Sequence, residues 1–279
     1  MRWQKIGAAI GFGLIIFIIA SIFTPNNQDS TLSVILSVST FLFGVFIAFA
    51  ISDRRSRMDA IRENDSVERG YIEELYRLSS IFGKKIQKEF QIVLDKYLMA
   101  TLDYPIFYYY FTEYEFKQID KKINELDISG DKEKIAYGNI MDIMEKMGVA
   151  RKKTIAHIGD TLSIFEWTIF TFLSIIIIST LLLSNSGEVY SALVVGIMSF
   201  IIALLIVFLD SLNSLQWKEE ERLFEPYQRT FEAIDLMRYY PEDLLREGRI
   251  TKHVGIKYRV GTYTFLNNKI IGKKISIKG

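Results

Sequence analysis

The chain contains no cysteine and only two histidines among its 279 residues. The absence of cysteine excludes disulfide bonds and thiolate metal sites, and it leaves the redox compartment undetermined. His157 and His253 do not have the spacing of metal ligands, so we predict no metal site. The net charge of +1 argues against nucleic-acid binding, because proteins that bind nucleic acids carry a marked basic excess.

Sequence motifs of common enzymes are missing as well. The chain has no G-x-G-x-x-G dinucleotide fingerprint, no Walker A loop and no G-x-S-x-G nucleophile turn. Together with the long apolar runs described next, these absences argue against an enzyme, and we expect no cofactor.

Apolar residues are abundant and concentrated. They make up 49% of the chain, the mean hydropathy is +0.17, and four runs stand out, at residues 6–23, 31–52, 167–184 and 189–209. A helix of about 20 apolar residues matches the hydrocarbon thickness of a bilayer. The first run resembles a signal peptide in its basic start, but its apolar core is long and no A-x-A site follows it. We therefore predict four transmembrane helices.

The distribution of lysine and arginine predicts the orientation of these helices. Basic residues lie before the first run, after the second, before the third and after the fourth, whereas the connections 24–31 and 185–188 have none. Lys and Arg next to a span stay on the cytoplasmic side. Both termini are therefore predicted to be cytoplasmic.

The spans divide the chain into four parts. Residues 1–52 and 164–210 form the membrane helices, residues 53–163 form a cytoplasmic helical domain, and residues 211–279 form a cytoplasmic helix and a basic tail.

Helical periodicity predicts one helix over 62–96, a turn at 127–132, a helix over 134–158 and a helical segment that ends near Leu245. Asn267-Asn268 between two β-prone runs predicts a possible small hairpin in the tail. The tail either faces anionic lipid headgroups or is a solvated terminus. The fold class is an all-α membrane protein with long cytoplasmic helical extensions.

The second run continues without a turn signal into a basic cluster, so we predict one long helix. A stripe of small and polar residues lies along its span: Ser33, Ser37, Thr40 and Gly44, extended by Ala48. Spacings of four, three and four place them on one helix face. Such a face on a spanning helix meets either water or other helices. Gly7, Gly11 and Ala8 form a comparable small-residue face on the first helix.

The segment from Tyr104 to Phe116 is dense in aromatic residues. We favour a packed hinge or subunit contact, in which tyrosine hydroxyls are satisfied at a wet edge. A binding surface is the alternative.

Two stretches carry a family resemblance. They are FLFGVFIAFAISDRRSR, from Phe41 to Arg57, and LDSLNSLQWKEEERLFEP, from Leu209 to Pro226. With two spans, a helical insert, two more spans and a cytoplasmic tail, the chain resembles the bestrophin family of ion channels, in particular its prokaryotic relatives. The resemblance implies a homo-pentamer in a prokaryotic plasma membrane, with five copies of the second helix around a pore.

Matching Gly44 to the family pattern implies a pore neck at Ser37, Phe41 and Val45. Phe41 and Val45 suit a hydrophobic constriction that gates by dewetting, whereas Ser37 departs from the apolar pattern. The stripe that contains Ser33, Ser37 and Gly44 suits an outer vestibule that keeps ions partly hydrated, or else close helix packing.

Charged residues at the cytoplasmic ends of the spans complete the candidate site. We assign Arg54, Arg55, Arg57 and Asp210 to the inner pore mouth and hypothesise a contact between Asp210 and one of the arginines, because an ionisable group at the edge of a span needs a partner or hydration. Animal bestrophins bind calcium in an acidic cluster at a place similar to that of residues 219–221 and Glu225. Here those glutamates lie in helical sequence and point in different directions, so we favour a solvated helix face.

The sequence thus predicts an oligomeric channel that conducts small inorganic ions across a lipid bilayer. The alternative is a non-conducting membrane protein, such as a signalling, scaffold or defence effector protein, that acts through its cytoplasmic helices. A channel needs the stripe on the second helix to face water in a symmetric ring, whereas a scaffold can bury it. A transporter fits less well, because no inverted repeat and no broken helix is visible.

Overall fold

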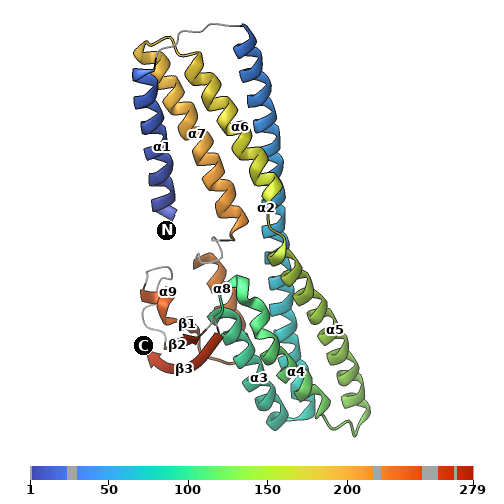
Figure 1. The fold of residues 1–279 in the computed structure, drawn as a ribbon. Helices are drawn as coiled ribbons and strands as arrows, with labels where there is room; N and C mark the ends of the chain where they lie inside the picture. The colour runs from blue at the N-terminus through green and yellow to red at the C-terminus, as the bar shows by residue number, and fades with distance from the viewer. Residues whose placement is uncertain (1, 24–29, 216–220, 247–256, 267–268, 279) are drawn as a thin grey trace. The chain divides into compact units, whose positions relative to one another are not determined.

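The computed structural model describes residues 2–23, 30–215, 221–246, 257–266 and 269–278, and it is mostly helical (Figure 1). The chain forms two compact units. Unit 1 comprises residues 1–58 and 161–216, and unit 2 comprises residues 59–160 and 217–279. The boundary between them falls inside one long helix, α2 (Ser30–Ser79), which confirms that the second apolar run continues without a break into the basic cluster.

Unit 1 is built from α1 (Arg2–Ile22), the first part of α2, α6 (Ile164–Leu183) and α7 (Val189–Asn213). Within the described residues, four helices are long and apolar enough to cross a membrane, and they agree with the four predicted runs, two of which extend one residue beyond the helix. Much of their apolar surface is exposed in the single chain. Such a surface is stable in lipid, where apolar side chains need not be shielded from water.

Helices α1 and α7 pack closely because two glycines face each other. A Cβ atom on Gly13 would lie 2.7 Å from Phe200 Cβ, and one on Gly196 would lie 2.8 Å from Phe17 Cβ. Small residues allow such close approach between membrane helices. The sequence assigned this role to Gly7, Gly11 and Ala8. In the described part of the single chain that face makes no close helix contact, because a Cβ atom on Gly7 or Gly11 would meet no atom within 4 Å and Ala8 is exposed.

The turn between α6 and α7 supplies hydrogen-bond donors to the carbonyl oxygens at the C-terminal end of α1. Asn185 is fully buried, and its Nδ2 donates hydrogen bonds to the carbonyl oxygens of Ala20, at 2.6 Å, and Phe23, at 2.9 Å. The last carbonyls of a helix have no partner within the helix. The side chain of Asn185 supplies that partner where water is scarce.

Helix α2 packs with α6 and α7 around a second apolar core in unit 1. Its buried members are Phe43, Ile47, Leu162, Phe170, Leu173, Ile177, Ile202 and Leu209. Helix α6 begins with a capping box in which Ser163 Oγ accepts from the Glu166 amide and Glu166 Oε2 accepts from the Ser163 amide at 2.7 Å. This reciprocal cap explains why a glutamate stands at the start of a spanning helix.

Unit 2 contains the rest of α2, then η1 (Ser80–Phe82), α3 (Lys84–Asp103), η2 (Ile106–Thr112), α4 (Glu113–Asn124), α5 (Asp131–Gly159) and α8 (Glu221–Ala233). The helix predicted over 134–158 is confirmed as α5, and the turn predicted at 127–132 precedes it.

The single helix predicted over 62–96 is wrong. The chain breaks at Gly83, whose φ of +99° is accessible to glycine but strained for other residues. Apolar residues continue at helical spacing across the break because both helices face the same core, whose members include Ile72, Leu75, Phe90, Leu94, Ile119, Ile140 and Phe231.

The C-terminal part adds β1 (Tyr239–Pro241), α9 (Glu242–Arg246), β2 (Tyr258–Leu266) and β3 (Lys269–Lys278). β2 and β3 pair antiparallel, which confirms the hairpin, while β1 pairs parallel to β2 and was not predicted. The helical segment expected to end near Leu245 instead stops at Ala233. Asp235 then takes a positive φ of +59°, and the chain turns into β1.

Candidate functional site

The predicted small-residue stripe lies on the open side of α2 in the single chain. Its members are all exposed: Ser33, Ser37, Thr40, Gly44 and Ala48. A Cβ atom on Gly44 would meet no atom within 4 Å. The stripe therefore does not mediate close helix packing within the described part of unit 1, and it is accessible to water or to another copy of the chain.

The packed side of α2 carries different residues. Phe43 and Ile47 are buried against α6 and α7. Ser39 is also buried there, and its hydroxyl donates to the carbonyl oxygen of Ile35 at 2.6 Å. This bond removes the cost of burying a hydroxyl group. Helix α2 thus has one packed side and one open side.

The three residues assigned to a pore neck follow one another at intervals of one turn. The Ser37 hydroxyl donates to Ser33 O at 2.8 Å and so satisfies itself within the helix. The Phe41 side chain is 69% exposed, and Val45 is partly buried. A phenylalanine this exposed contributes little to the packing of its own chain.

The three arginines that the sequence analysis assigned together to the inner pore mouth have different environments in the structure. Arg54 and Arg57 are buried, at 5% and 4% exposure. Arg54 Nε donates to Asp53 Oδ2 at 3.0 Å, and Arg57 Nη1 donates to Asn213 O at 2.9 Å. Arg55 is exposed. Helical spacing could have indicated this difference, because Arg55 follows Gly44 by about three turns and so shares its side of the helix.

Asp210 near the end of α7 has a different partner from the one hypothesised. Its Oδ2 lies 2.5 Å from Lys5 Nζ of α1. The expectation of a contact with one of the arginines of α2 is therefore corrected. The pair links two helices of unit 1 at a point where both side chains are still partly exposed.

In unit 2 the aromatic segment contributes to a buried charged cluster. The Glu68 carboxylate accepts hydrogen bonds from the hydroxyls of Tyr97 and Tyr109. Arg151, only 2% exposed, donates to Tyr97 and also to Thr112 Oγ1 at 3.1 Å. Burial, followed by the charge of Glu68, raises the pKa of Tyr109 well above its usual value. Arg151 is one of the basic residues that precede the third apolar run, and the sequence pattern did not predict its burial.

Other members of the aromatic segment are exposed, notably Phe107, Tyr110 and Tyr114. The segment is therefore a packed element with an outer aromatic surface. The packing expected for it is seen for Tyr109, and nothing in the described residues identifies a ligand for the exposed rings.

A second buried carboxylate lies where the sheet meets α3. Asp103 Oδ1 accepts from the hydroxyls of Tyr239, at 2.7 Å, and Tyr263, at 2.5 Å, and its Oδ2 lies 2.6 Å from Lys273 Nζ. Gly261 makes this geometry possible, because a Cβ atom at that position would collide with the Tyr239 hydroxyl. Burial raises the pKa of Asp103, and the ammonium of Lys273 opposes this shift.

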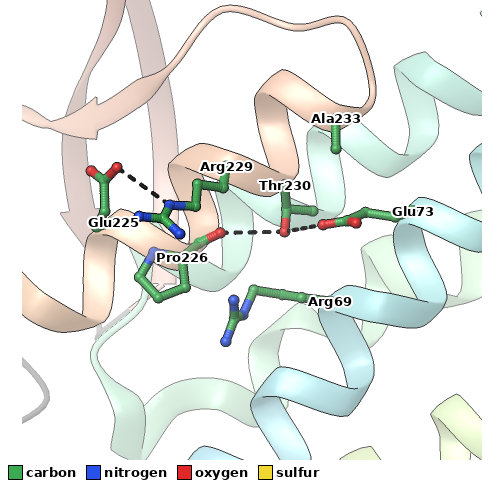
Figure 2. A pocket seen from close by; sticks show the side chains of 7 residues that line it. All are labelled: Arg69, Glu73, Glu225, Pro226, Arg229, Thr230 and Ala233. Atoms are coloured by element: carbon green, nitrogen blue, oxygen red, sulfur yellow. Dashed lines mark hydrogen bonds and ion pairs between the residues drawn. The ribbon is translucent and has the colours of Figure 1, made fainter.

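A groove of about 680 Å³ lies between α2 and α8 in unit 2 (Figure 2). Arg69 and Glu73 reach into it from α2. On α8, Arg229 pairs with Glu225 at 3.7 Å, and Thr230 Oγ1 donates to Glu73 at 2.8 Å. Positive and negative groups in this groove compensate each other, so it does not define a binding site for ions of one sign.

The structure describes only part of the acidic segment at residues 219–225, which the resemblance compares with a calcium site. Residues 219 and 220 and the side chain of Glu221 lie outside the described part of the chain. Glu225 pairs with Arg229 and with Arg238, whose Nη1 lies 3.3 Å from Glu225 Oε2. Among the described residues, no group of three or more His, Cys, Asp or Glu side chains is placed to hold a metal ion.

Comparison with known protein families gives one match. The model of the Bestrophin-like domain family matches residues 7–214, which include most of α1, all of α2, α6 and α7, and most of unit 2. Neither the curated proteins nor the solved structures contain a match to the chain.

Proposed function

Because the chain belongs to the Bestrophin-like family, which is known for channels, we propose that it is an oligomeric ion channel with a pore lined by α2. The observation that supports this proposal is the open side of α2. It carries hydroxyl groups and small residues on a helix that is otherwise apolar enough to cross a membrane. Exposed hydroxyls are better solvated in a water-filled pore than in lipid.

The same surface supports the proposed oligomerisation. In one chain the stripe is on the outside of unit 1, so a single copy cannot enclose it. A closed ring of identical copies would bring the stripes together around one axis. The family suggests five copies, and five copies of α2 would surround a central pathway for small inorganic ions.

Phe41 and Val45 are the proposed constriction. Apolar side chains that narrow a pore block ions by excluding water, and the pore conducts when it widens or wets. The strong exposure of Phe41 in the single chain supports this role, since the ring is available to meet its symmetry mates. Ser33, Ser37 and Gly44 would line the wider and more polar part.

We also propose a prokaryotic plasma membrane as the location, with both termini in the cytoplasm. The arrangement of lysine and arginine around the four helices supports the orientation. The exposed apolar surface of unit 1 supports contact with the lipid bilayer.

Ion flux from liposomes tests the channel. Phe41→Ala should increase flux or change selectivity, because it widens the proposed constriction. Phe172→Ala is a matched control, since Phe172 is 62% exposed and lies on α6 rather than on α2. The control should conduct like the wild type.

Absence of flux from wild type and Phe41→Ala, with assembly intact, would reject the channel. It would favour a non-conducting signalling, scaffold or defence effector protein, and the exposed tyrosines of the aromatic segment would then be the next residues to examine.

A further inference from the structure

On the open side of α2, one basic side chain, that of Arg55, lies at the cytoplasmic end of the proposed pore. We infer that Arg55 forms a ring of positive charge at the inner mouth and makes the pore prefer small inorganic anions. This inference rests on the proposed function, because it needs α2 to line the pore.

Position along α2 gives the first argument. Arg55 follows Gly44 by eleven residues, which is close to three turns of an α-helix, so it lies on the open side below the stripe. The same rise places it roughly 17 Å from Gly44 along the axis. Arg55 therefore stands at the mouth, beyond the constriction assigned to Phe41 and Val45.

Comparison with the adjacent arginines gives the second argument. Arg54 and Arg57 are turned into unit 1, where Asp53 and the carbonyl oxygen of Asn213 bind them. Arg55 is exposed, and it has no ion pair or hydrogen bond with any residue that the structure describes. Of the three cations that follow the span, only Arg55 can place its charge in the water of a pore.

Acidic residues nearby do not cancel this charge. Asp53 pairs with Arg54 and, two residues before Arg55, lies about half a turn round the helix from it. One turn after Arg55, Asp59 pairs with Arg62 at 3.3 Å, so these two charges compensate each other. The open side of α2 thus carries one uncompensated positive charge per chain at this level.

A symmetric assembly multiplies this charge by the number of copies. Rings of Arg or Lys side chains select anions by concentrating them at the pore entrance and repelling cations. Such an effect weakens with salt, because the Debye length falls from about 10 Å at 0.1 M to about 3 Å at 1 M ionic strength. The constriction should control the rate of conduction, and Arg55 should control which ions enter.

The test is the reversal potential of the purified full-length protein in planar bilayers under a KCl gradient. The wild type should reverse near the chloride equilibrium potential. Arg55→Gln should move the reversal potential toward zero, Arg55→Glu should move it toward the potassium equilibrium potential, and Arg55→Lys should keep the wild-type value. The shift caused by Arg55→Gln should shrink when both solutions contain high salt.

Lys152→Gln is the matched control, because it removes one exposed positive charge from α5 rather than from α2. It should leave the reversal potential unchanged. All variants are also measured with Phe41→Ala, in case the wild-type constriction is closed.

Three results would overturn the inference while leaving the channel intact: a conducting wild type that prefers cations, Arg55 variants with the wild-type reversal potential, or an equal shift in Lys152→Gln. Silence of both the wild type and Phe41→Ala would instead reject the proposed function, and the inference with it.

Discussion

Gly13 of α1 and Gly196 of α7 lie directly opposite each other. A Cβ atom on Gly13 would lie 3.2 Å from Gly196 O, and one on Gly196 would lie 3.3 Å from Gly13 O. The two helices of unit 1 therefore approach as closely as their backbones permit. Other helical glycines, such as Gly7 and Gly11, have open space around them.

Replacement of Gly196 by alanine should weaken the contact between α1 and α7. The added methyl group would collide with Phe17, and overpacking of this kind costs about 1–3 kcal/mol. The temperature at which the detergent-solubilised protein loses its monodisperse chromatographic peak should fall. Gly7→Ala serves as the control and should leave it unchanged or raise it, since alanine favours a helix. Equal behaviour of both variants would contradict the close contact.

The ion pair between Lys5 and Asp210 predicts coupled effects of substitution. Asp210→Asn and Lys5→Gln should each lower the same temperature slightly, because a partly exposed pair contributes less than about 1 kcal/mol. Exchange of the two charges, Lys5→Asp together with Asp210→Lys, should restore most of the thermal stability that each single substitution removes. If the exchange costs as much as the sum of the single substitutions, the two side chains do not interact.

The buried cluster of unit 2 predicts a larger effect. Arg151→Met leaves Glu68 buried without its counter-ion, and breaking a buried pair in this way costs about 3–5 kcal/mol. Hydrogen exchange in α3 and α5 should accelerate strongly. Glu68→Leu combined with Arg151→Met should recover part of the protection, because no unpaired charge remains. Lys152→Met is the control at the next position, which is exposed; if it has the same effect, burial of Arg151 is not the cause.

Asp103 predicts a dependence of stability on pH. Its pKa is raised in the folded protein, so its stabilising contribution is complete below the ordinary value of 3.8 and is lost as the pH rises through the folded value. Glu115, whose pKa burial also raises, acts in the same direction. The protection factors of the β1 and β2 amides, which are corrected for the intrinsic pH dependence of exchange, should therefore rise as the solution is acidified through this window.

Asp103→Asn should reduce this pH dependence while keeping an acceptor oxygen for Tyr239 and Tyr263. Asp95 is a useful comparison, since it binds Arg259 of β2 bidentately, at 2.7 and 2.8 Å. Asp95→Asn should weaken the attachment of β2 without removing the dependence due to Asp103. An unchanged pH profile in Asp103→Asn would show that another group causes it.

The sequence by itself determined the four apolar helices, the length of α2, helix α5 and the hairpin of β2 and β3. These features depend on local patterns: long apolar runs, 3.6-residue periodicity and turn residues between β-prone runs. The resemblance carried by residues 41–57 and 209–226 also identified the family, because it combined the order of spans with local motifs.

Tertiary structure decided the rest, since periodicity gives the spacing of residues on a helix but not the neighbour that covers each side. It therefore decided that Gly13 rather than Gly7 meets α7, that Lys5 rather than an arginine binds Asp210, and that Arg54 turns inward while Arg55 stays open. The break at Gly83 was hidden for the same reason, because α2 and α3 face one core and their apolar spacing runs on across the turn. Burial of Arg151 depended on Glu68, Tyr97 and Tyr109, which are distant in sequence and meet only when unit 2 folds.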